Sequence, residues 1–141
     1  MQTTLAIIKP DACAGQQAGA ILARLQERGF QPRGMRLQRL TEAQARAFYE
    51  VHRERPFYES LVAFMTSGAV VPIALEREDA VAELRRAIGA TDPAEADPGT
   101  IRADFAESKE RNAIHASDSP ENAAREVAFF FAESELLAAR D

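Results

Sequence analysis

Short apolar segments alternate with amphipathic helical segments along the chain, and this alternation limits the possible folds more than any other feature. Residues 5–8, 33–40 and 70–75 and the segment around His115 have the length and pattern of strands. The order strand, helix, strand, helical hairpin, strand, helix, loop, strand, helix gives two βαβ-like units. We therefore predict an α/β chain, more closely an α+β sandwich in which helices cover a four-stranded antiparallel sheet.

The predicted helices have recognisable ends. A helix over about residues 14–28 is followed by Gly29, which is typical of the position after a helix. Thr41 and Gln44 match a capping box that opens a helix to about residue 53, and Pro56 opens the next one. Three further segments complete the assignment: a helix over 78–88, a helix over 120–131 and a C-terminal tail over 133–141.

Two segments of this assignment are unusual: one strand contains a proline, and one loop is long. Pro72 lies inside the predicted strand 70–75, and because proline has no N–H it favours an edge strand or a bulge. Residues 91–100 are polar and rich in proline, and they form a longer connection than most. Long ordered loops are usually functional, so we expect this loop to belong to a site.

Size and charge restrict the class of protein. A chain of 141 residues with 46% hydrophobic residues is predicted to form one domain over 1–141. The net charge of -5 argues against nucleic acid as a main partner. No apolar stretch approaches the length of a membrane span, so we expect no membrane association and a cytoplasmic location. The single cysteine, Cys13, is interpreted as a buried thiol without function.

Four side chains at predicted element ends could hold a phosphate group. The chain has no glycine-rich phosphate loop, so any phosphate must be bound by side chains. Lys9, Arg85, Thr91 and Arg102 lie at element ends or beside the long loop, and guanidinium groups bind phosphate oxygens well. Each of these residues taken alone is a weak signal, and a lone arginine more often lies on a solvent-exposed face.

The stretch from Asn112 to Asp118 contains the candidate reactive side chain, His115. Taken alone, it favours a packed histidine at the end of a strand. Asp118 and Ser119 precede the helix at Pro120 and are interpreted as candidates for its N-cap. His52 is interpreted as a surface or core histidine.

Several motifs in order resemble the nucleoside diphosphate kinase family from end to end. They are Ile8-Lys9-Pro10-Asp11, Arg53-Glu54-Arg55-Pro56-Phe57, Ser67-Gly68, Gly89-Ala90-Thr91-Asp92-Pro93, Pro98-Gly99-Thr100-Ile101-Arg102-Ala103-Asp104-Phe105 and Asn112-Ala113-Ile114-His115-Ala116-Ser117-Asp118-Ser119. The resemblance implies a ferredoxin-like fold and a phosphohistidine mechanism. His115 would take the γ-phosphate of ATP or another nucleoside triphosphate and pass it to a nucleoside diphosphate.

The resemblance also implies roles around His115. Glu126 would fix the second imidazole nitrogen, with Ser117 bonded to that carboxylate. Arg85, Thr91 and Arg102 would hold the terminal phosphates. Mg²⁺ would be carried by the nucleotide phosphates, with no metal ligands from the protein.

Further residues would bind the rest of the nucleotide. Lys9 matches a lysine that reaches the sugar hydroxyl and phosphates, Tyr49 the tyrosine beside it, and Asn112 an amide that bonds the sugar. Phe57 and Leu61 match the pair that covers the base; the spacing alone would make them core residues. Because an aromatic face reads no hydrogen-bonding edge, broad base specificity is expected. The family also implies a homo-oligomer built from dimers through the second strand.

Three positions depart from the family pattern: Ala69, Pro72 and Ala116. Ala116 is the one beside His115, and we predict an ordinary negative φ there. Two alternative functions stay open at this point. One is a non-catalytic nucleotide-binding module of the same fold, and the other is a histidine phosphotransfer carrier, which would be an all-helical bundle.

Overall fold

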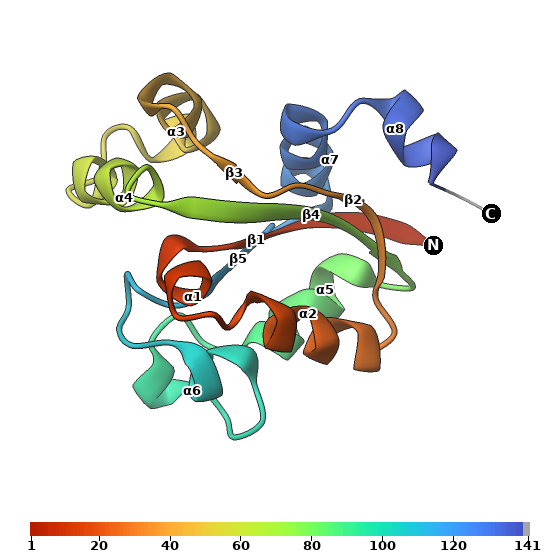
Figure 1. Cartoon of the computed structure of the whole chain (residues 1–141), viewed down its shortest axis with the longest axis horizontal. Coiled ribbons are helices and arrows are strands. Elements are labelled where there is room, and N and C mark those ends of the chain that lie inside the picture. The colour runs from red at the N-terminus through yellow and green to blue at the C-terminus, as the bar shows by residue number, and fades with distance from the viewer. Residues whose placement is uncertain (140–141) are drawn as a thin grey trace.

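A computed structural model describes residues 1–139, and an antiparallel sheet lies at its centre (Figure 1). The strands are β1 (Gln2–Ile8), β2 (Gln31–Met35), β3 (Gln38–Arg39), β4 (Ala69–Arg77) and β5 (Ile114–Ala116). Four of them follow the order β2-β4-β1-β5, and β3 also pairs with β4. The predicted fold class is confirmed, but the sheet has five strands, because the predicted strand 33–40 is interrupted between β2 and β3.

Helices cover both faces of the sheet (Figure 1). They are α1 (Pro10–Ala14), α2 (Ala18–Glu27), α3 (Glu42–Phe48), α4 (Tyr58–Met65), α5 (Ala80–Ile88), α6 (Ile101–Phe105), α7 (Pro120–Phe130) and α8 (Glu133–Ala138), with 3-10 turns η1 (Glu50–His52) and η2 (Pro93–Glu95). In Figure 1, α3, α4 and α7 lie on one side of the sheet, and α1, α2, α5 and α6 lie on the other. The sheet within residues 1–139 excludes an all-helical phosphotransfer carrier.

The central strand β1 contributes to both cores. Ala6 and Ile8 pack with residues of α2 and α5, whereas Leu5 and Ile7 pack with residues of α3, α4 and α7. Alternate residues of a strand point to opposite faces, so a strand segment buried between two helical layers favours apolar residues at consecutive positions, as in Leu5–Ile8. This burial explains the continuous apolar run before Lys9, and it fixes the end of β1 where that lysine lies.

Pro72 lies in an interior strand, contrary to the edge or bulge that its missing N–H favours. It faces Ile7 of β1, and its carbonyl accepts a hydrogen bond from the Arg36 backbone N–H at 3.2 Å. The N–H and C=O of one strand residue point to the same side, so the missing donor faces the interruption between β2 and β3. The proline therefore removes a donor where the ladder is already broken.

The structure confirms some helix ends and corrects others. Thr41 forms the predicted capping box with Gln44, and Ser119, not Asp118, accepts the N-cap hydrogen bond of α7. The helix predicted from about residue 14 begins at Ala18, because a turn with Gln16 at a φ of 59° separates it from α1. Cys13 is half-buried, not buried.

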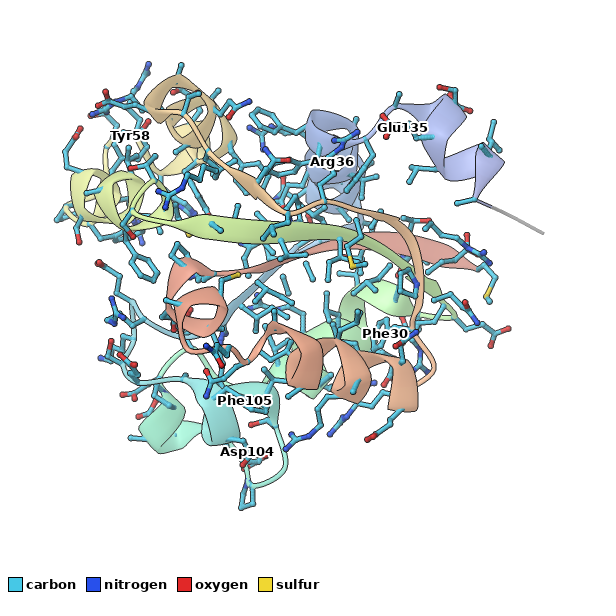
Figure 2. All side chains as sticks on the ribbon, viewed as in Figure 1. Phe30, Arg36, Tyr58, Asp104, Phe105 and Glu135 are labelled. Carbon is cyan, nitrogen blue, oxygen red and sulfur yellow. The ribbon has the colours of Figure 1, made fainter. Side chains whose placement is uncertain are left out.

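The predicted tail forms α8 over Glu133–Ala138, while residues 140–141 lie outside the described residues. Figure 2 shows Arg36 beside Glu135, and their side chains form a salt bridge at 2.5 Å. The Arg36 guanidinium also lies 4.8 Å from the centre of the Phe131 ring. The salt bridge with Arg36, which lies between β2 and β3, therefore helps to hold this helix, and local periodicity does not reveal it. Within residues 1–139, none of the helices has the length and apolar character needed to cross a bilayer.

Gly89 ends α5 in a conformation that side chains rarely adopt, with a φ of 85°. A Cβ at this position would lie 2.5 Å from Thr100 Oγ1. We predict that Gly89→Ala lowers the free energy of unfolding by at least about 2 kcal/mol, because backbone strain and overpacking add. Urea unfolding checks this value. Gly19→Ala is the control, since a Cβ added there in α2 would meet nothing within 4 Å; equal stability losses in the two variants would contradict the prediction.

Candidate active site

A cleft of about 950 Å³ opens beside the end of β1, and every predicted site residue except Ser117 lines it. These residues come from segments that are far apart in the chain: Lys9, Tyr49, Phe57, Leu61, Arg85, Thr91, Arg102, Asn112, His115 and Glu126. Ser117 is fully buried and contacts Glu126 from below the cleft surface. The fold thus brings the predicted set together in one place.

His115 lies in the middle of β5, where its backbone pairs with Ile7. Its Nε2 is 2.7 Å from Glu126 Oε1, and the Ser117 hydroxyl donates to the same oxygen at 2.7 Å. An ionised carboxylate only accepts hydrogen bonds, so the neutral imidazole carries its proton on Nε2. Nδ1 then keeps its lone pair, and the side chain is 18% exposed.

Burial sets the charge state of this pair. Burial lowers the pKa of His115, although the hydrogen bond to Glu126 raises it, and the charges of Lys9 and Arg102 lower it further. Burial raises the pKa of Glu126, but the hydrogen bonds with His115 and Ser117 and the His115 charge outweigh this effect and lower it. At neutral pH the imidazole is therefore uncharged and the carboxylate ionised, as a histidine nucleophile requires.

Aromatic rings hold the imidazole from the side. The ring centre of Phe48 lies 5.3 Å from that of His115, and the Tyr49 ring lies 6.0 Å away, both edge to face. The Tyr49 hydroxyl is buried without a hydrogen-bond partner in residues 1–139. Burial, helped by the charge of Glu126, raises the pKa of Tyr49, so the phenol stays protonated as a possible donor.

Two arginines place positive charge next to His115. Arg102 is buried, and its guanidinium donates to the Ile114 carbonyl at 2.7 Å and to the Gly89 carbonyl at 3.3 Å. Arg85 donates to the Ala116 carbonyl at 3.4 Å. Burial, followed by the charge of Arg85, lowers the pKa of Arg102 to about 10.

No salt bridge involves Arg85 or Arg102 in the described part of the chain. Concentrated positive charge without an acidic partner is costly, and an anion in the cleft would offset that cost. The arrangement therefore suits an anionic group, and guanidinium groups match phosphate oxygens in geometry.

Lys9 adds a third cation through a chain of hydrogen bonds. Its Nζ donates to Asn112 Oδ1 at 2.8 Å, and the Asn112 amide donates to the carbonyls of Lys109 at 2.9 Å and Thr91 at 3.3 Å. Burial, followed by the charge of Arg102, lowers the pKa of Lys9 to about 8, while Asp11 and Glu110 act in the opposite direction. The lysine is thus mainly charged at neutral pH.

The backbone strain near His115 lies at Ala113 and not at Ala116. Ala116 is absent from the non-glycine residues with positive φ, which confirms the prediction for it, whereas Ala113 has a φ of 75°. Such a conformation costs about 1 kcal/mol in an alanine. Asp11 accepts from the Ala113 N–H at 3.0 Å, and the Lys9 N–H donates to the Ala113 carbonyl at 2.8 Å.

Asp11 is a site residue to which the sequence patterns assigned no role. Its carboxylate is buried beneath Lys9 and holds the backbone that leads into β5. Its place directly after Lys9-Pro10 in the first family motif was the available signal, but only the fold shows that it reaches residue 113.

The outer part of the cleft has an apolar wall on α4 and the turn before it. Phe57 is 42% exposed and Leu61 is half-buried, so neither is a buried core residue. The His52 ring lies 5.3 Å from that of Phe57 and stacks on Tyr49 at 6.4 Å. His52 therefore lines the cleft instead of serving only as a surface or core histidine.

The comparison with known protein families identifies the chain. The model of the family described as nucleoside diphosphate kinase matches residues 2–136. The chain belongs to the nucleoside diphosphate kinase family. A nucleoside diphosphate kinase from Nitratiruptor sp. is 56% identical over 137 residues, covering 97% of this chain and all of the relative. One from Chlorobaculum tepidum is 55% identical over 137 residues, covering 97% of this chain and 98% of the relative.

Solved structures of nucleoside diphosphate kinases have the same fold. The Aquifex aeolicus enzyme superposes with a TM-score of 0.93 at 49% identity, covering 95% of this chain and 97% of that one. The Halobacterium salinarum enzyme, solved in complex with CDP, superposes with a TM-score of 0.91 at 37% identity, covering 95% and 90% of the two chains. As a member of the nucleoside diphosphate kinase family, the chain is a phosphotransferase.

The sequence predicts that the protein side chains supply no metal ligands. Within residues 1–139, no group of three or more histidine, cysteine, aspartate or glutamate side chains is placed to hold a metal ion. The cationic residues around His115 would repel a bare metal ion, whereas they would accept a metal that arrives bound to phosphate oxygens.

Proposed function

We propose that this protein transfers the γ-phosphate of a nucleoside triphosphate to a nucleoside diphosphate through a phosphohistidine at His115. The observation that carries the proposal is the pairing of His115 Nε2 with Glu126 Oε1 at 2.7 Å, in a cleft that also contains Arg85 and Arg102. The carboxylate fixes the tautomer, so that Nδ1 holds the lone pair that attacks.

In the first half of the reaction, Nδ1 would form a bond to the γ-phosphorus while the bond from that phosphorus to the β,γ-bridging oxygen breaks. The nucleoside diphosphate leaves with the electron pair of the broken bond. The phosphorylated imidazole is cationic while Nε2 keeps its proton, and Glu126 would stabilise that charge. The second half reverses these steps with a different diphosphate as acceptor.

The cationic side chains would stabilise the charge on the phosphoryl group during transfer. Arg102 is held by two backbone carbonyls, so its guanidinium is oriented before the substrate binds. Electrostatic groups that are positioned in advance need no reorganisation during the reaction. Arg85 and Thr91 would complete the set around the phosphates.

The remainder of the nucleotide would extend toward the apolar wall. Lys9 and Asn112 would contact the sugar, and Lys9 would also reach the phosphates. Beside Lys9, the protonated Tyr49 hydroxyl would act as a hydrogen-bond donor. Phe57 and Leu61 would cover the base. Their apolar surfaces favour stacking without a choice among hydrogen-bonding edges, which supports broad base specificity.

Magnesium would enter with the nucleotide. When bound there, Mg²⁺ would neutralise part of the phosphate charge, while Arg85, Thr91 and Arg102 would hold the phosphates that carry it. The residues present fit this arrangement, since Arg85, Thr91 and Arg102 line the cleft and offer donors to phosphate oxygens. Within residues 1–139, no group of three or more histidine, cysteine or carboxylate side chains is placed to hold the metal itself.

We also propose a homo-oligomer built from dimers. We propose a cytoplasmic location as well, where nucleotides would have access to the cleft. The support for the oligomer is β2, which ends the strand order and is followed by the 74% exposed Leu37. Proteins commonly cover such an edge by pairing it. No nucleic-acid or membrane partner is proposed.

Initial-rate kinetics test the proposed reaction. Rates are measured with purified protein while a nucleoside triphosphate and a nucleoside diphosphate are both varied. Parallel double-reciprocal lines are expected for a covalent intermediate. Intersecting lines would contradict the phosphohistidine, and binding without transfer would favour the alternative of a non-catalytic nucleotide-binding module.

The rate of His115 phosphorylation should depend on pH through two groups. The lowered pKa of His115 extends the range of the neutral imidazole below pH 6.5, so the acid limb should lie below that value. Lys9 loses its charge as pH rises through about 8, so the rate should fall on the alkaline side. Single-turnover rates at subsaturating ATP report the free protein. An acid limb at or above pH 6.5 would contradict a neutral, buried nucleophile.

A further inference from the structure

A hydrogen bond joins α4, which carries the cleft residue Leu61, to Glu110, which also lines the cleft. Ser60 lies on α4, three residues after Phe57, and its hydroxyl donates to Glu110 Oε2 at 2.5 Å. Glu110 lines the cleft and lies on the loop that leads into β5. The bond therefore links the proposed base-binding wall to the loop that carries Asn112.

The loop over residues 107–112 is bonded within itself. The N–H groups of Glu107 and Ser108 donate to the Arg111 carbonyl at 2.8 and 3.2 Å, and the Arg111 N–H donates to the Ser108 hydroxyl at 3.1 Å. Asn112 is tied to it by the bond from its amide to the Lys109 carbonyl. A displacement of the loop would therefore carry Asn112 with it.

Two contacts hold this loop against α4. One is the bond between Ser60 and Glu110, and the other places the Arg111 guanidinium 5.5 Å from the centre of the Phe64 ring. Lys9 Nζ donates to Asn112, so the position of the loop also affects the lysine in the phosphate-binding part of the cleft. Phe57, Asn112 and Lys9 are thus connected through Glu110.

We propose that Glu110 is a positioning residue for nucleotide binding: its hydrogen bond to Ser60 fixes the outer cleft, and its negative charge supports the Lys9 ammonium. The inference rests on the proposed function only in taking a nucleoside diphosphate as the ligand. The hydrogen bond and the charge are two separable contributions of one carboxylate.

The electrostatic contribution has a defined set of neighbours. The charged and titratable groups that interact electrostatically with Lys9 are Arg102, His115, Asp11 and Glu110. Burial and Arg102 lower the pKa of Lys9, whereas Asp11 and Glu110 raise it. Removal of the Glu110 charge should therefore lower the pKa of Lys9, so that nucleotide affinity is lost at a lower pH.

Two substitutions separate the contributions. Ser60→Ala removes the hydrogen bond and keeps the charge, whereas Glu110→Gln keeps an oxygen that accepts from Ser60 and removes the charge. We expect Ser60→Ala to weaken Mg·ADP binding about three- to fivefold at neutral pH, the scale of one hydrogen bond, without moving the alkaline midpoint. Glu110→Gln should move that midpoint to lower pH.

Calorimetric titration with Mg·ADP between pH 6 and 9.5 measures both effects. Ser60→Thr, which keeps a hydroxyl, should restore affinity. Glu54→Gln is the matched charge control, because this side chain is 90% exposed and lies outside the cleft. Unchanged affinity in Ser60→Ala, or equal midpoints in Glu110→Gln and Glu54→Gln, would overturn the proposal. Binding is measured without transfer, so a failure to phosphorylate His115 would overturn the proposed function and leave this test intact.

Discussion

His115→Asn is expected to lower the rate of phosphoryl transfer by about 10⁴-fold or more, the scale seen when a nucleophile is removed. The asparagine amide approximates the shape of the imidazole but has no lone pair of comparable nucleophilicity. The cationic residues and the apolar wall of the cleft remain, so Mg·ADP affinity should stay within about threefold of the wild-type value. Single-turnover transfer from ATP, measured with nucleotide binding, checks both expectations.

The stability of this variant provides its control. Loss of the ring removes the contacts with Phe48 and Tyr49 and the hydrogen bond to Glu126, whose carboxylate keeps the hydrogen bond from the Ser117 hydroxyl. Unfolding curves therefore have to show that the variant is folded under assay conditions. A folded variant that still transfers phosphate at the wild-type rate would place the nucleophile elsewhere.

Arg102→Met is expected to produce the second largest effect, a loss of about 10³-fold in the rate of His115 phosphorylation. The guanidinium is buried beside the nucleophile and has no salt-bridge partner in residues 1–139. Methionine fills a similar volume but supplies neither the charge nor the donors for phosphate oxygens. The Ile114 and Gly89 carbonyls also lose their donor, so some loss of stability should accompany the loss of rate.

Rapid-quench measurement of the phosphorylated protein distinguishes these effects. Arg86→Met is the matched control, because Arg86 is 67% exposed, pairs with Glu83 and lies outside the cleft. It should phosphorylate within about twofold of wild type, as expected for a surface position. If Arg102→Met and Arg86→Met behave alike, Arg102 does not stabilise the transferring group.

Periodicity and capping patterns predicted most of the fold, because they reflect local constraints. The capping box at Thr41 and the glycine at residue 89 are signals of this kind. The missed features depend on distant contacts. The helix α8 is held by a salt bridge to Arg36, about one hundred residues earlier in the chain, and the interruption between β2 and β3 faces the missing donor of Pro72.

The candidate site likewise has features that the sequence predicts and features that depend on contacts between distant residues. Motifs gave the residue types around His115, and the fold gathers them in one cleft. The motifs did not locate the positive φ at Ala113, because it depends on Asp11 more than one hundred residues away. They also gave no sign of the bond between Ser60 and Glu110, which exists only after α4 and the loop over 107–112 come together.

The central claim is that His115 carries the phosphoryl group between two nucleotides. The most direct measurement is to incubate the protein with Mg·ATP without an acceptor and to map the phosphate by mass spectrometry under non-acidic conditions. We expect one phosphate per chain, on His115, that is released when a nucleoside diphosphate is added. Phosphate on another residue, or none on His115 while nucleotide is bound, would contradict it.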